Sequence, residues 1–306
     1  MASYFKSFTI VTVEPNIEDT LLVVDKPCPN VDAEYDKITK SLPYRRFFDD
    51  HYDLFSNLSR VGGTNILTID DAWEAYQTFA IEIDHGFWWD DVWSHEKQQA
   101  IVDELKPVSD FHYSTLFNNT LIQKVRSGYL IEELYTNMIH AINGSSTTKF
   151  YVYSGHDKTL ASLMSLLGIF NNQIVPFGSV LFFELHQINQ SHIIRIYYLN
   201  ETFENKRYLI RQNKCDGNTD CLLEQFQSIV EPFIIKDFNS DCGITDPDNT
   251  NNLNLFLIVI FALIGAIIGM LCSCLYFCIS NKSKIARENK EAKQKLNTSQ
   301  HKTYYT

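Results

Sequence analysis

Basic residues are scarce in this 306-residue chain, and over one long stretch charge is missing altogether. Lys and Arg number 26 against 37 Asp and Glu, which leaves a formal net charge of −11. An acidic chain repels the phosphate backbone of nucleic acids, so nucleic-acid binding is excluded as a function. Internal repeats and low-complexity tracts are also missing, which excludes solenoid and fibrous architectures.

The stretch without charge covers residues 253–279. A helix rises about 1.5 Å per residue, so roughly 20 apolar residues cross a hydrocarbon core about 30 Å thick, and this stretch is long enough. A buried core helix is the alternative, but soluble helices rarely run so far without a charged side chain. Residues 253–279 are therefore predicted to form one transmembrane helix, with residues 246–252 as the linker before it.

Charges on either side of the apolar stretch predict its orientation. Six Lys and Arg follow it within residues 280–295, whereas none lies between Lys236 and the stretch. Because positive residues stay in the cytosol, residues 280–306 are predicted to be a basic cytosolic tail lying against anionic lipid headgroups. The preceding residues then face a lumen or the cell exterior, and the lipid bilayer is a predicted partner.

A secretory signal peptide is missing from the first residues, which contain no apolar core of adequate length. Two explanations remain open: the chain inserts by its tail alone with a cytosolic N-terminal domain, or its true beginning lies upstream of residue 1. Asn-X-Ser/Thr sequons before the apolar stretch favour the second explanation. They start at Asn57, Asn118, Asn143, Asn189 and Asn200.

The seven cysteines divide into two groups. Four lie before the apolar stretch, an even number that allows three disulfide pairings, and they are Cys28, Cys215, Cys221 and Cys242. The other three lie at the cytosolic end of the span, at Cys272, Cys274 and Cys278. These three are either S-acylated or simply small apolar residues of the helix.

The pattern of apolar residues predicts an α/β fold with a helical insertion. Residues 4–24 are strand-like, and helical spacing then dominates residues 36–147, as in Leu130, Leu134 and Met138. A buried strand is predicted at residues 149–153 and a helix at 159–170. Further strands are predicted at residues 180–185, 192–198 and 207–211. We therefore assign residues 1–35 and 148–245 to an α/β core and residues 36–147 to a helical cap.

A candidate site lies at Ser154-Gly155-His156-Asp157, between the predicted strand and helix. Backbone N–H groups at the start of a helix favour a bound anion, and glycine permits a tight turn there. His156 is able to donate to a phosphate oxygen, and Asp157 to act as an acid when an anion beside it raises its proton affinity. The alternative is a helix cap beside a histidine that has only a structural role.

The surrounding residues resemble the second signature of the histidine acid phosphatases of the prostatic and lysosomal type. The likeness lies in Tyr-Val-Tyr-Ser-Gly-His-Asp-Lys-Thr-Leu at 151–160, Leu-Leu-Gly-Ile-Phe-Asn at 166–171, and Val-Pro-Phe-Gly-Ser at 175–179 with Phe-Phe-Glu-Leu at 182–185. It continues to Asp-Phe-Asn-Ser-Asp-Cys at 237–242 and includes Lys-Pro-Cys-Pro at 26–29. The likeness is thin through the cap.

This resemblance implies particular pairings and roles. Cys28 would pair with Cys242, and Cys215 with Cys221. The family hydrolyses phosphate monoesters through a phosphohistidine and without a cofactor or metal. Asp157 would then be the proton donor to the leaving alcohol, while His156 and Gly155 would contact phosphate. A homodimer is a further expectation from the family.

One motif of that family is missing from this sequence. Its first signature, Arg-His-Gly-x-Arg-x-Pro, carries the attacking histidine and the arginines that clamp the phosphate, and no such run is present. Nucleophilic catalysis needs both, so the chain as written is expected to be inactive and truncated at its N-terminus. The sequence thus predicts a membrane-anchored acid phosphatase of the lysosome, endosome or cell surface. The alternative is a non-catalytic binding or adhesion glycoprotein on the same scaffold.

Overall fold

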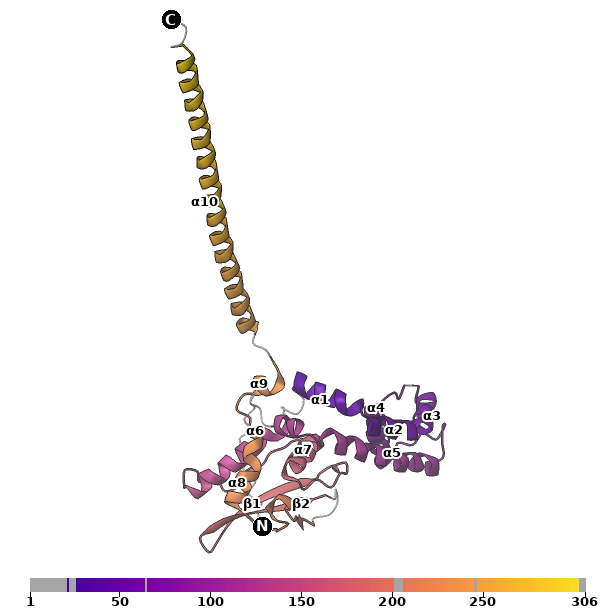
Figure 1. Cartoon of the computed structure of the whole chain (residues 1–306). Helices are drawn as coiled ribbons and strands as arrows, with labels where there is room; N and C mark the ends of the chain where they lie inside the picture. The colour runs from indigo at the N-terminus through magenta and orange to yellow at the C-terminus, as the bar shows by residue number, and fades with distance from the viewer. Residues whose placement is uncertain (1–20, 22–25, 64, 201–205, 245–246, 303–306) are drawn as a thin grey trace, which may run out of the picture. The chain divides into compact units, whose positions relative to one another are not determined.

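A computed structural model describes residue 21 and residues 26–63, 65–200, 206–244 and 247–302, in two compact units, residues 1–244 and 245–306 (Figure 1). The strand predicted at residues 4–24 lies, apart from Leu21, outside the described residues. The mixed helix and sheet of the first unit and the apolar C-terminal helix of the second confirm the predicted fold class. The divisions placed at residues 35 and 147 stay predictions.

Six helices fill the described part of the chain before the candidate site, and most begin at a side-chain cap. Thr68 and Asp71 form a reciprocal capping box at the start of α4, and Asn119 accepts hydrogen bonds from two backbone N–H groups at the start of α6. The six helices are α1 (Pro29–Thr39), α2 (Leu42–Asp50), α3 (Tyr52–Gly62), α4 (Ile69–Asp84), α5 (His95–Leu116) and α6 (Thr120–Ile142).

The first five helices share an apolar core of their own. Phe55, Ile69 and Leu105 are its fully buried centre, and the stacked rings of Phe47 and Phe111 close one side. Burying each of these side chains stabilises the folded unit by roughly 1.5–3 kcal/mol.

An antiparallel sheet supports the other side of the unit. β1 (Val180–Ile188) and β2 (Ser191–Leu199) form a hairpin whose two turn residues, Asn189 and Gln190, have positive φ. Two short strands, β3 (Tyr208–Leu209) and β4 (Cys221–Leu222), also pair with β2. The strands predicted at 180–185 and 192–198 are thus confirmed, and the one predicted at 207–211 is confirmed only at Tyr208–Leu209.

The strand predicted at residues 149–153 is wrong. The segment has no regular secondary structure, and the side chains of Phe150 and Val152 are 76% and 74% exposed. Two tyrosines hold the segment: Tyr153 donates to Glu133 and accepts from Asn137 on α6, and the hydroxyls of Tyr151 and Ser146 lie 3.2 Å apart. A buried strand needs neighbouring strands to satisfy its backbone groups, and no described strand pairs with this segment.

Helix α7 (Asp157–Leu167) follows and packs against α6, in place of the predicted helix at 159–170. The two helices meet through small residues, and the hydroxyls of Ser127 and Ser162 lie 2.7 Å apart in the buried contact. A side chain at Gly128 of α6 would come within 2.4 Å of the Phe233 carbonyl oxygen, so only glycine fits there.

Short elements complete the first unit after the sheet. These are the 3-10 turns η2 (Asn213–Cys215) and η3 (Glu231–Phe233) and the helices α8 (Leu223–Val230) and α9 (Phe238–Cys242). The Val230 and Phe226 side chains of α8 are buried beneath α6 and α7 in the same core as the sheet.

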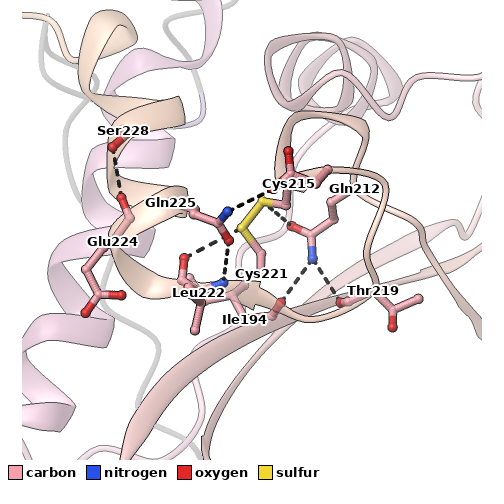
Figure 2. The surroundings of a disulfide bond; sticks show 10 residues. Ile194, Gln212, Cys215, Thr219, Cys221, Leu222, Glu224, Gln225 and Ser228 are labelled. Carbon is pink, nitrogen blue, oxygen red and sulfur yellow. Dashed lines mark hydrogen bonds between the residues drawn. A yellow bond between two sulfur atoms is a disulfide. The ribbon is translucent and has the colours of Figure 1, made fainter.

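Both disulfides implied by the resemblance are present, Cys28–Cys242 and Cys215–Cys221. The second fastens a short loop to the sheet, because Cys221 lies on β4 opposite Ile194 (Figure 2). The buried amide of Gln212 donates to the carbonyl oxygens of Ile194 and Thr219, which holds the same loop from its other end (Figure 2).

The second unit consists of one helix, α10 (Pro247–Lys302). Within it, Phe256–Lys293 is long and apolar enough to cross a membrane, with a mean hydropathy of 2.8 in its most apolar window. The helix does not break at residue 252 or at residue 279, so the described parts of the predicted linker and tail continue the same helix.

The two disulfides should differ in their contribution to stability. The Cys28–Cys242 bond closes a loop with a sequence separation of 214, against 6 for Cys215–Cys221. We expect the double variant Cys28→Ala/Cys242→Ala to lower the free energy of unfolding by about 3–5 kcal/mol, and Cys215→Ala/Cys221→Ala by about 2 kcal/mol, because the longer loop restricts the unfolded chain more. Urea unfolding of both variants measures this, and equal losses would contradict it.

Candidate active site at the start of helix α7

The His156–Asp157 pair lies where helix α7 begins. His156 occupies the N-cap position with extended backbone angles, and its N–H donates to the Thr159 hydroxyl at 3.2 Å. Its carbonyl accepts the first helical hydrogen bond, from Leu160. Asp157 is the first helical residue, where the positive end of the helix dipole favours a negative charge.

Gly155 has a different reason for being glycine than the predicted one. Its backbone is not in the left-handed region, so the chain conformation does not demand glycine. A Cβ at this position would instead lie 3.2 Å from three side-chain atoms of Thr159, closer than most contacts of that kind. Gly155 therefore lets the chain pass close to the side chain that accepts from His156.

The two side chains of the pair are in different environments. The side chain of His156 is exposed to solvent, where a ligand can reach it. The carboxylate of Asp157 is held on both oxygens. Oδ2 accepts from the Tyr113 hydroxyl at 2.5 Å, and Oδ1 accepts from the Lys158 N–H at 2.7 Å. Both donors fix the orientation of the carboxyl group.

Tyr113 reaches Asp157 from the cap. It lies near the end of α5 and is fully buried, and its ring packs against Trp73 of α4. Burial, and after it the negative charge of Asp157, raises the pKa of Tyr113 well above its usual range. The hydroxyl therefore remains protonated and always acts as a donor to Asp157.

His112 forms a second buried group behind the site. Its side chain is 2% exposed, and its ring stacks on Trp73 with the centroids 5.1 Å apart. Neither ring nitrogen has a hydrogen-bond partner among the residues that the structure describes, and Nε2 lies 3.4 Å from a carboxylate oxygen of Asp70. Burial lowers the pKa of His112 to about 4, and the positive charge of Lys158, whose ammonium lies over the Trp73 ring, acts in the same direction. Asp70 offsets this little, because its side chain is half exposed and screened by water.

Sequence reasoning missed Tyr113, His112 and Lys158. Tyr113 and Asp157 are 44 residues apart, and no motif spans that distance. The run Asp110-Phe-His-Tyr113 reads as an ordinary helix segment, so only the packing of α5 on α7 identifies these residues.

The five sequons lie at the surface of the first unit to different degrees. Asn118, Asn143 and Asn189 are exposed, with Asn189 in the turn between β1 and β2. Asn57 and Asn200 are half-buried, and the amide oxygen of Asn200 is fully covered. The first three are therefore the more accessible to a glycosylating enzyme.

Known proteins are similar in sequence to this chain over most of its length. The sequence profile of the histidine phosphatase superfamily (branch 2) matches residues 6–199. The lysosomal acid phosphatase of Xenopus laevis is 26% identical over 85% of this chain and 60% of its own length. The prostatic acid phosphatase of Rattus norvegicus is 26% identical over 74% of this chain and 58% of its own length. The lysosomal acid phosphatase of Homo sapiens is 24% identical over 84% of this chain and 59% of its own length.

Two observations therefore agree. The structure has a mixed helix and sheet unit with a His-Asp pair at the start of a helix, and the family profile matches more than half of the chain. The chain belongs to the histidine phosphatase superfamily, branch 2. It spans about 60% of the length of the curated relatives it matches. All three of these relatives are named as acid phosphatases, and none as a binding or adhesion protein.

The contact between Tyr113 and Asp157 should be measurable as a coupling. Tyr113→Phe removes a hydrogen bond to a charged acceptor, so we expect the free energy of unfolding to fall by about 1.5–3 kcal/mol. In a double-mutant cycle with Asp157→Ala, followed by urea unfolding, the interaction energy should be about 1–2 kcal/mol. Additive losses would show that the two side chains do not interact in solution.

The free energy of unfolding should decrease as the pH falls, because His112 is buried in its neutral form. Its pKa in the folded chain is about 4 against a usual value of 6.5, so the unfolded chain binds more protons between these two values. The contribution of His112 is complete above pH 6.5 and is lost as the pH falls toward 4, by about 3 kcal/mol in total. We expect His112→Phe to flatten the dependence of the unfolding free energy on pH in this window, measured by urea unfolding. The exposed His85 provides the control, and an equal effect of His85→Phe would contradict the assignment.

Proposed function

We propose that this chain is a membrane-anchored acid phosphatase component in which His156 and Asp157 act on a phosphate monoester. The observation that carries the proposal is the pairing of an exposed imidazole with a carboxylate fixed on both oxygens, adjacent at the start of one helix. The names of the relatives favour the same substrate class.

The arrangement suits two different tasks. His156 donates to an oxygen of the phosphate group, and the positive end of α7 supports the negative charge there. Asp157 protonates the oxygen of the leaving alcohol. Its two hydrogen bonds fix the position of the carboxyl group. Tyr113 holds the carboxyl group in one orientation meanwhile, and orientation lowers the barrier to proton transfer.

These residues do not include an attacking nucleophile. The family's Arg-His-Gly-x-Arg-x-Pro run does not occur in the 306 residues, and neither His156 nor Asp157 replaces its histidine and arginines. We therefore propose that the 306 residues alone do not turn over a phosphate monoester. In this proposal, the 306 residues supply the proton donor and one phosphate contact.

The membrane topology is part of the proposal. The apolar part of α10 crosses the bilayer once, and the basic residues after it face the cytosol. The unit that carries the site is then luminal or extracellular, in the lysosome, the endosome or at the cell surface. The disulfides and the exposed sequons support an oxidising, glycosylating compartment.

An aryl phosphate assay at acid pH tests the proposal. We expect no turnover by the 306 residues alone, and turnover when a relative's segment bearing Arg-His-Gly-x-Arg-x-Pro is fused before residue 1. In that fusion, Asp157→Asn should lower kcat by about 10²–10⁴-fold with a smaller change in KM, because general acid catalysis acts in the transition state.

Matched substitutions keep this test specific. Asp103→Asn makes the same chemical change as Asp157→Asn, but on the exposed face of α5, and should leave kcat unaltered. His85→Ala is the matching control for His156→Ala and should also leave kcat unaltered. Turnover by the 306 residues alone, lost in His156→Ala, would overturn the claim of inactivity. A folded, active fusion in which Asp157→Asn has no effect would overturn the role of Asp157 as the acid.

A further inference from the structure

The apolar part of α10 is longer than a bilayer requires. Residues 253–279 number 27, a helical length of about 40 Å against a hydrocarbon core of about 30 Å. Counted from Leu253, about 20 residues suffice, and the twentieth is Cys272. Roughly 10 Å of apolar helix therefore extends into the headgroup region at the C-terminal end, unless the helix tilts strongly.

Cys274 and Cys278 lie in this extra segment, and Cys272 is the residue immediately before it. Cys272, Cys274 and Cys278 are free thiols, and each is exposed on α10. Tyr276 stands between them, an aromatic residue of the kind enriched at the membrane interface, and Lys282 follows one turn after Cys278. The thiols thus lie at the boundary itself and not in the middle of the span.

The helix places two of these thiols and a cation on one face. At 3.6 residues per turn, Cys274, Cys278 and Lys282 are spaced four apart and share a side of α10, whereas Cys272 lies on the opposite side. Because α10 continues unbroken to Lys302, the basic side chains that approach anionic headgroups are rigidly connected to the thiols. An acyl chain attached to Cys278 would re-enter the hydrocarbon beside the exposed Phe277 and Ile279 and cover them.

We propose that Cys278, with Cys274 as a secondary position, is a site of S-acylation by a long-chain fatty acid. The sulfur attacks the carbonyl carbon of a cytosolic long-chain acyl thioester of coenzyme A, a C–S bond forms, and the bond to the coenzyme sulfur breaks. The proton of the cysteine thiol ends on the released coenzyme thiol, and no group is oxidised or reduced. The inference rests on the proposed topology, in which this end of α10 faces the cytosol.

The test uses the full chain, expressed in animal cells behind a cleavable signal peptide. After free thiols are blocked, hydroxylamine releases thioesters, and each released thiol is labelled with a polymer that adds a visible mass step. We expect a hydroxylamine-dependent shift in the unaltered chain, the loss of most of it in Cys278→Ser, and none in the triple variant Cys272→Ser/Cys274→Ser/Cys278→Ser.

Two further measurements distinguish a failure of the acylation proposal from a failure of the proposed topology. In the triple variant, Ala262→Cys places a thiol near the middle of the span and should remain unlabelled, whereas a chain that retains only Cys278 should be labelled. Removal of N-linked glycans from the same samples reports which side holds the first unit. Glycosylated chains without a hydroxylamine-dependent shift, or equal labelling through Ala262→Cys, would overturn the acylation while the topology stands. Unglycosylated chains would overturn the topology.

Discussion

One covalent bond defines the frame within which the first unit is built. Cys28 and Cys242 join the residue before α1 to the end of α9, and both are fully buried. Their cluster also contains Tyr113 and Met164, which belong to α5 and α7. The cap, the sheet and the short Cys215–Cys221 loop all lie inside the ring that this bond closes. A contact between cap and site is therefore made within a closed chain, where the entropy of bringing distant segments together is already reduced.

The candidate site shows what that frame makes possible. Asp157 is oriented by a tyrosine from the cap, while its neighbour His156 remains open to solvent. This difference suits the roles we propose, because a proton donor has to be oriented toward one atom of the substrate, whereas a phosphate contact has to be accessible to it. Behind them, the buried ring nitrogens of His112 have no hydrogen-bond partner among the described residues, which costs stability.

Local patterns predicted some elements well and others not at all. The hairpin of β1 and β2 was predictable, because alternating apolar residues flank a turn within a few positions. Helix α7 was predictable from its one apolar face, although its start was placed two residues late. The segment 149–153 has the composition of a strand, but strand formation depends on a neighbour that composition does not report.

The sequence by itself determined the apolar helix, the four cysteines of the first unit and the His156–Asp157 pair, because each is expressed in adjacent residues or in their composition. Only the tertiary structure decided that Tyr113 fixes Asp157, that His112 is buried behind it, and that Thr159 and not the turn explains Gly155. These contacts join different helices or depend on a side chain packed one turn away. Their energies come from packing between segments that are distant in the chain, which no local pattern records.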